Sequence, residues 1–118
     1  MAEINELLKG FQRFRNKSFE PNRELFNRLA LQGQTPRTLL IGCSDSRVDP
    51  AILTDSAPGA LFVVRNVASL IPPYETTGRY HGTSAALEYA VCNLEAENTI
   101  LLGHSPCGGI KALLEGYG

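Results

Sequence analysis

Short apolar runs that alternate with helical patterns constrain the fold of this chain more than any other feature of its sequence. The runs at 38–42, 60–67 and 99–102 each lead into small or polar residues, as buried parallel strands do at their ends. Apolar residues recur at helical spacing over 83–95 and again over 110–115. This alternation predicts an α/β fold, in which a parallel β-sheet core is covered by flanking helices.

The first part of the chain predicts an N-terminal helical arm. Residues 1–14 carry one apolar stripe at helical spacing, formed by Ile4, Leu7, Leu8, Phe11 and Phe14. After the polar stretch 15–20, Pro21 suits the first turn of a second helix. The inward side chains of that helix are expected to be Leu25, Phe26, Leu29 and Ala30. A length of 118 residues fits one domain, with the arm at 1–33 and the α/β core at 34–118.

The composition excludes several classes of partner. Eleven Lys and Arg against twelve Asp and Glu give a net charge of −1, so we expect neither nucleic acid nor a membrane as partner. The apolar runs fall far short of the ~20 residues that cross a bilayer, and the N-terminus lacks the apolar segment of a secretion signal. Three cysteines suit metal binding or thiol chemistry in a reducing compartment. We therefore expect a cytoplasmic protein.

Polar clusters follow the first and third apolar runs. Cys43, Asp45 and Arg47 come after the first run, whereas His104 and Cys107 come after the third. Because the carboxyl ends of parallel strands meet at one crevice, the two cysteines and the histidine are expected to converge. Two thiolates and an imidazole suit Zn²⁺ and leave a fourth position for chemistry. Asp45 could fill that position or pair with Arg47 instead, and the sequence leaves both possibilities open.

Other residues with chemical potential have simpler interpretations. A single cysteine usually packs as a small apolar residue, so Cys92, in the middle of the helix at 83–95, is expected in the core. His81 precedes that helix and is expected at the surface or as a helix cap. Gly108 and Gly109 open the last helix, where free backbone N–H groups could hold an anionic substrate.

Two motifs resemble the signatures of the β-class carbonic anhydrases. They are CSDSRV at 43–48 and HSPCGG at 104–109. The resemblance also includes FVVRNV at 62–67 and covers roughly 34–114. Because both motifs fall directly after apolar runs, they lie where the fold prediction places the crevice.

The resemblance implies a site and a reaction. Cys43, His104 and Cys107 would bind Zn²⁺, and Asp45 with Arg47 would form a dyad that gates the open position. The reaction would be the reversible hydration of carbon dioxide to bicarbonate and a proton by zinc-bound hydroxide, which makes the chain a zinc lyase. Since hydroxide competes with Asp45 for the metal better than water does, activity is expected to rise toward alkaline pH.

The resemblance also implies a small apolar substrate pocket at a dimer interface. Matched motif by motif, the pocket residues are Gln34, Phe62, Val67 and Tyr89. Leu40 stands where the bicarbonate-regulated bacterial members carry a tryptophan. The inhibitory bicarbonate site of those members is therefore not expected here.

By this resemblance, the chain contains only part of the family fold. Family members continue past the zinc loop with another strand and C-terminal helices, so this chain is either a fragment or completes its fold by association. An open strand edge favours self-association, and we expect a homodimer or a larger homo-oligomer. Two alternative functions stay open: hydrolysis of carbonyl sulfide or carbon disulfide on the same site, and a zinc-binding assembly module without turnover.

Overall fold

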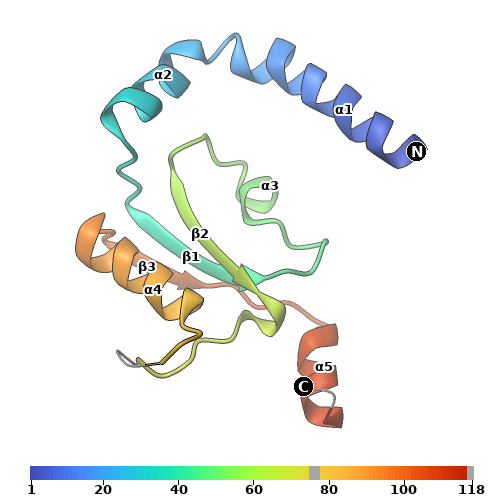
Figure 1. The fold of residues 1–118 in the computed structure, drawn as a ribbon, viewed down its shortest axis with the longest axis vertical. Helices are drawn as coiled ribbons and strands as arrows, with labels where there is room; N and C mark the ends of the chain where they lie inside the picture. The colour runs from blue at the N-terminus through green and yellow to red at the C-terminus, as the bar shows by residue number, and fades with distance from the viewer. Residues whose placement is uncertain (75–77, 117–118) are drawn as a thin grey trace. The chain divides into compact units, whose positions relative to one another are not determined.

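The chain forms two compact units, Met1–Gln34 and Thr35–Gly118. The computed structural model describes residues 1–74 and 78–116. The first unit is helical and the second contains the sheet (Figure 1). Among the described residues, no helix combines the length and the apolar character that crossing a membrane requires.

The N-terminal unit is helical along most of its length. Its elements are α1 (Ala2–Phe14), a π-helical segment (Arg15–Phe19) and α2 (Arg23–Gln32). The stretch 15–20, expected as a polar connection, therefore continues the helix. Phe26 of α2 packs against Phe14 and Phe19, with ring centroids 5.8 and 5.2 Å away. Ala30 lies one turn beyond Phe26, past these rings, and is exposed, which corrects the expectation that it faces inward.

The second unit is built on a three-stranded parallel sheet. Its strands, in spatial order, are β2 (Leu61–Asn66), β1 (Thr38–Cys43) and β3 (Asn98–Leu101). In the middle strand, Thr38 pairs with Leu61 on one side and with Asn98 on the other. Because β1 is flanked on both sides, it is buried from Leu39 to Cys43. The predicted α/β class with a parallel sheet is confirmed.

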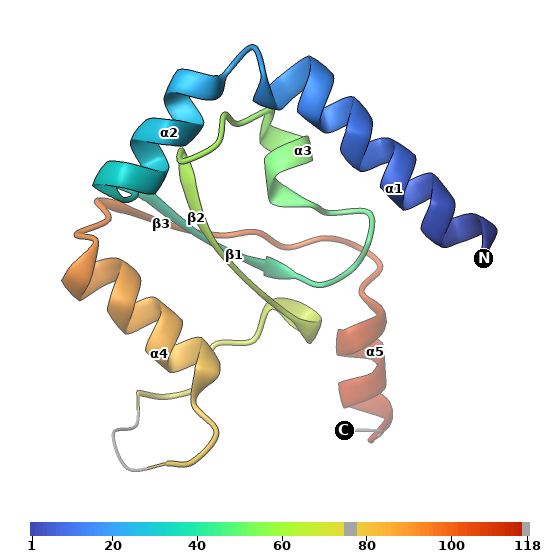
Figure 2. The same ribbon diagram turned by 45° about the horizontal axis from the view of Figure 1, so that its top comes forward.

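The helices that connect the strands cover opposite faces of the sheet. α3 (Pro50–Thr54) lies between β1 and β2, and α4 (Gly82–Glu88) lies between β2 and β3. Since β2 and β3 lie on opposite sides of β1, right-handed crossovers place these helices on opposite faces, as both views show (Figures 1 and 2). α3 was not predicted, because five residues are too few to show a helical period. α5 (Gly108–Glu115) follows β3 and begins at the glycine pair, earlier than its apolar pattern indicated.

The core lies between the sheet and α4. Its buried residues are Leu39, Ile41, Val64 and Ala90, and the partly buried residues packed on them are Phe62, Ala86, Leu87 and Ala96. By contrast, every residue of β3 is exposed, including the apolar Ile100 and Leu101. The core is therefore built around β1 and β2, and β3 contributes little to it.

Cys92 is exposed, so the prediction that it packs in the core is wrong. Beyond α4, residues Tyr89–Asn93 form a π-helical turn, in which the N–H of Leu94 donates to the carbonyl of Tyr89 at 3.0 Å. A π turn contains more residues than an α turn and shifts the helical phase. The shift leaves Ala90 buried and turns Cys92 outward. His81, just before α4, is exposed as expected.

Candidate metal centre

Two strands bring the three candidate metal ligands together. Cys43 is the last residue of β1, and the loop that follows β3 supplies His104 and Cys107. β1 and β3 are neighbours in the sheet, so their carboxyl ends open onto the same crevice. One ligand atom from each of the three residues lies within 4.8 Å of the other two. The Sγ atoms of Cys43 and Cys107 are 3.9 Å apart.

The geometry and the donor set fit a zinc ion. Two sulfurs that each lie about 2.3 Å from a tetrahedral zinc are about 3.8 Å apart, which matches the observed separation of 3.9 Å. Both ring nitrogens of His104 are buried and have no well-oriented hydrogen-bond partner among the described residues. A buried nitrogen without a partner is costly, and coordination of a metal would remove that cost for one of the two.

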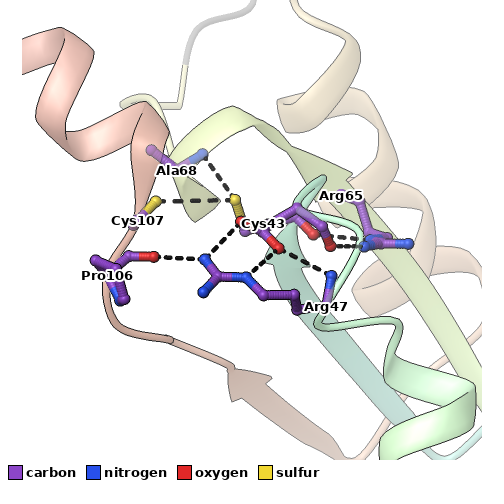
Figure 3. A network of polar contacts seen from close by, with 7 residues as sticks. Cys43, Arg47, Arg65, Ala68, Pro106 and Cys107 are labelled. Carbon is purple, nitrogen blue, oxygen red and sulfur yellow. Dashed lines mark hydrogen bonds and ion pairs between the residues drawn. The ribbon is translucent and has the colours of Figure 1, made fainter.

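The surroundings of Cys43 favour its thiolate form. Its pKa is lowered to about 7, mainly by a backbone hydrogen bond from Asp45 and then by the neighbouring His104 ring, while burial acts in the opposite direction. The backbone N–H of Ala68 also donates to the Cys43 sulfur at 3.3 Å (Figure 3). Ala68 holds a positive φ of 74°, a strained conformation for a residue with a side chain. These contacts prepare the sulfur for a cation, since the thiolate is the form that binds metal.

Asp45 pairs with Arg47 in this structure. The guanidinium of Arg47 donates from Nε to Oδ1 at 3.0 Å and from Nη2 to Oδ2 at 2.9 Å, and its backbone N–H donates to Oδ1 at 2.8 Å. Hydrogen bonds from this side chain hold the pKa of Asp45 well below its usual range. The sequence left two partners open for Asp45, a metal ion and Arg47. In this structure its carboxylate forms a bidentate pair with Arg47.

Arg47 also joins the two loops of the site. Its Nη2 atom donates to the carbonyl oxygen of Pro106 at 2.6 Å (Figure 3). Pro106 lies between His104 and Cys107 in the loop after β3, whereas Arg47 lies in the loop after β1. One guanidinium thus holds the Asp45 carboxylate and the backbone of the second ligand loop.

Two further residues shape the site in ways that sequence reasoning did not predict. Arg65 of β2 donates to the carbonyls of Cys43 and Asp45, at 2.8 Å each. Gly109 of α5 allows a close approach, because a Cβ atom there would lie 2.5 Å from Cγ1 of Val67. A charged residue inside an apolar strand was the one signal for Arg65, and the paired glycines were the signal for Gly109.

The expected pocket residues lie in different places. Phe62 of β2 and Tyr89 after α4 lie against each other, with ring centroids 5.8 Å apart. Val67 is exposed and lies beside α5, and Gly108 is exposed at the start of that helix. Gln34 is exposed and belongs to the N-terminal unit. The structure therefore brings Val67 next to the ligand loop and pairs Phe62 with Tyr89.

Two cavities border His104 and Cys107. One, of about 390 Å³, is lined by residues that include Ala68, Ser69 and Leu102. The other, of about 450 Å³, is lined by residues that include Lys111 and Leu114. Both are large enough for a small molecule such as a triatomic gas, so the candidate ligands can be reached from the surface.

A family model described as carbonic anhydrase matches residues 38–118 of this chain. A carbonic anhydrase of Synechocystis sp. is 47% identical over 112 residues, which are 95% of this chain and 40% of that protein. A carbonic anhydrase of Synechococcus elongatus is 43% identical, with the same shares of the two chains. This chain therefore spans about 40% of the length of the curated relatives that it matches.

Solved structures show the same similarity. The structure of the β-carbonic anhydrase CcaA matches with a TM-score of 0.87 and 46% identity, over 98% of this chain and 50% of that chain. The structures of two β-carbonic anhydrases from Sordaria macrospora, described as tetrameric, match with a TM-score of 0.83 and 34% identity, over 97% of this chain and 55% of that chain. The similarity thus includes both units of the chain but only part of each neighbour.

Proposed function

This chain belongs to the β-carbonic anhydrase family, and on this basis we propose that its site hydrates carbon dioxide reversibly to bicarbonate and a proton. The observation that carries the proposal is the group formed by Cys43, His104 and Cys107, with ligand atoms within 4.8 Å of one another. The paired side chains of Asp45 and Arg47 lie on the loop that directly follows Cys43. Hydration of carbon dioxide needs a metal ion that activates water, and a nearby carboxylate such as that of Asp45 can accept a hydrogen bond from that water.

In the proposed site, Cys43, His104 and Cys107 hold Zn²⁺. When bound, the ion would act as a Lewis acid that acidifies a water molecule for attack on carbon. The residues of the chain prepare this arrangement. The N–H groups near the Cys43 sulfur stabilise its negative charge, and both ring nitrogens of His104 are buried.

Asp45 and Arg47 would control access to the open position. Bidentate pairing with Arg47 prevents the Asp45 carboxylate from filling that position itself. An ionised carboxylate only accepts hydrogen bonds. Asp45 can therefore accept a hydrogen bond from the attacking water and orient it, while Arg47 keeps the carboxylate in place.

Several other residues would contact the substrate. Carbon dioxide carries no charge, so apolar walls such as Phe62 and Val67 suit it. Tyr89, which lies against Phe62, would complete this pocket. Gly108 begins α5, and the free N–H groups at a helix start attract anions, so this end of the pocket suits bicarbonate.

We also propose a homo-oligomer, a dimer or larger, in a cytoplasmic location. The exposed apolar residues of β3 support association. Cys43, Cys92 and Cys107 are free thiols, which suits a reducing compartment.

Substitution of Arg47 tests the mechanism. In Arg47→Ala, Asp45 loses its partner and is free to occupy the open position, so we expect CO2 hydration to be abolished while zinc stays bound. Stopped-flow hydration and elemental analysis on the same preparation measure both quantities. Arg28→Ala, which removes an exposed arginine of α2, is the matched control and should keep the wild-type rate.

The outcomes separate the alternatives. Activity of the zinc-loaded wild-type chain that rises toward alkaline pH supports the proposal, and full activity of Arg47→Ala contradicts the gating role. Hydrolysis of carbonyl sulfide or carbon disulfide without CO2 hydration would change the substrate. Stoichiometric zinc without any turnover would identify an assembly module instead.

A further inference from the structure

A single guanidinium from the neighbouring strand binds the backbone on both sides of Ser44. Arg65 lies in β2, and its Nε atom donates to the carbonyl oxygen of Cys43 at 2.8 Å. Its Nη2 atom donates to the carbonyl oxygen of Asp45, also at 2.8 Å. The Arg65 side chain is 27% exposed. Figure 3 shows this guanidinium and Arg47 approaching the same loop.

These two hydrogen bonds fix the direction of the chain where β1 ends. In the parallel register Cys43 pairs with Asn66, and the backbone N–H of Ser44 donates to the carbonyl of Asn66 at 2.8 Å. The strand ladder therefore stops at Ser44, and Arg65 extends the contact with β2 to Asp45. Hydrogen bonds from a charged donor are shorter and stronger than those between neutral groups. The two donors of a planar guanidinium also keep the two carbonyls in one relative orientation.

The two arginines bind different parts of Asp45. Arg47 binds its carboxylate, whereas Arg65 binds its main-chain carbonyl. Arg65 therefore acts on the main chain of Asp45 and leaves its carboxylate to Arg47.

We propose that Arg65 is a positioning residue for the metal centre, which anchors the backbone of Cys43 and Asp45 so that both side chains face the ion. This inference rests on the proposed function, because it assigns Arg65 a role toward the zinc site. Asp49 is a further charged neighbour, with Oδ2 3.8 Å from Nη1 of Arg65. Asp49 also caps α3 by accepting the N–H of Ala51 at 3.1 Å, so its contact with Arg65 can be tested separately.

The experiment compares zinc affinity among three variants of the full chain. Arg65→Met keeps the length of the side chain but removes both donors. Loss of such a group behind a metal ligand typically weakens metal binding by about 10 to 100-fold, and we expect a loss in this range. Arg65→Lys keeps the charge but offers one ammonium to two carbonyls, so it should bind zinc with intermediate affinity. Asp49→Asn keeps a capping side chain and should bind zinc like the wild type.

Two readouts separate positioning from general stability. Zinc affinity is measured by competition with a chromophoric chelator, and the ligand field is followed in the visible spectrum of the cobalt(II)-loaded chain. We expect Arg65→Met to change the cobalt spectrum even where circular dichroism shows a folded chain. If Arg65→Met does not fold, Arg65→Lys carries the same comparison.

The results distinguish this inference from the proposed function. Wild-type affinity and an unchanged cobalt spectrum in folded Arg65 variants would overturn the positioning role and leave the proposed function standing. A wild-type chain that binds zinc but hydrates no CO2 would overturn the proposed function, while weakened binding in Arg65→Met would still support the anchor. A wild-type chain that takes up no zinc would overturn both.

Discussion

The sequence offers the Asp45 carboxylate two partners, a metal ion held by Cys43 and the guanidinium of Arg47. Its position two residues after Cys43 allowed it to be a metal ligand, and the arginine two residues further along allowed an ion pair. The structure has the ion pair, because three donors of Arg47 converge on the carboxylate within 3.0 Å. A carboxylate held by three donors stays ionised, and its role is that of an acceptor.

The ion pair between Asp45 and Arg47 makes the stability of the fold depend on pH. The folded pKa of Asp45 is depressed by Arg47, so the ion pair stabilises the fold above the usual carboxyl pKa and loses this effect as the pH falls through the folded value. Asp45→Asn should therefore unfold at lower urea concentration than the wild type at neutral pH. The difference should shrink in strong acid. Equal urea midpoints at neutral pH would contradict this contribution.

Another prediction concerns the thiols. Bound zinc should protect Cys43 and Cys107 from alkylation and leave the exposed Cys92 reactive, because a coordinated sulfur is not free to attack. In the metal-free chain, alkylation of Cys43 should accelerate as the pH rises through about 7, where its thiolate forms. Mass spectrometry of the alkylated peptides measures each site.

Cys92→Ser is the matched control for this experiment. It should remove the rapid reaction of the zinc-loaded chain without changing its zinc content. Rapid labelling of Cys43 or Cys107 in the zinc-loaded Cys92→Ser chain would show that these sulfurs do not hold the ion.

The start of α5 bears directly on the candidate metal centre, because Cys107 immediately precedes this helix. A Cβ atom on Gly109 would lie 2.5 Å from Cγ1 of Val67 and 3.0 Å from the Cβ and backbone N of Ala68. The helix can therefore approach the segment after β2 only with glycine at this position. That segment also carries the N–H that contacts the Cys43 sulfur.

Gly109→Ala should separate these two elements. We expect a loss of stability of about 1 to 3 kcal/mol, as for other overpacked contacts, together with weaker zinc binding because Cys107 moves with the helix. Gly108→Ala is the matched control, since a Cβ atom there meets nothing within 4 Å. Urea denaturation and chelator competition measure the two effects. Equal losses in both variants would refute the packing argument.

Helices and strands with a clear repeat of apolar residues could be predicted from the sequence. Very short helices, and contacts that depend on how two strands are aligned, could not. The apolar run before Cys43 identified the central strand, and the polar motifs after β1 and β3 identified the three candidate metal ligands that the structure brings together. The five residues of α3 were too few to show a period. Cys92 was misplaced because a π turn changes the helical phase, and a local sequence pattern does not reveal this.

The contact of Arg65 illustrates the same limit at a functional residue. Its role depends on the register of β2 against β1, which places it opposite Gly42, next to the end of the central strand. Register is a property of two segments together. The sequence of β2 alone shows only a charged residue in an apolar run.

The third strand carries exposed apolar side chains at an edge of the sheet. β3 lies at the edge of the sheet, and Ile100 and Leu101 are 46% and 60% exposed. Among the described residues β3 pairs on one side only, and such an edge next to exposed apolar side chains favours contact with another chain. The tetrameric assembly described for the Sordaria macrospora neighbours is consistent with association in this family.

We therefore expect the chain to self-associate as its concentration rises. Leu101→Lys should weaken association, because a lysine at an edge strand must be desolvated when another chain pairs with it. Ile52→Lys, which changes an exposed apolar residue of α3, should have little effect. Sedimentation velocity over a concentration series measures the change. A wild-type chain that stays monomeric throughout would contradict the expectation.

The separation of the ligands along the chain has a consequence for how long the protein survives. Cys43 and Cys107 are 64 positions apart, so an ion held by both acts as a reversible cross-link that closes a long loop. A permanent link across such a loop would reduce the entropy of the unfolded chain by the equivalent of about 4 kcal/mol at room temperature. Loss of the ion would therefore destabilise the fold as well as remove the Lewis acid, so we expect the metal-free chain to be degraded faster than the zinc-loaded chain.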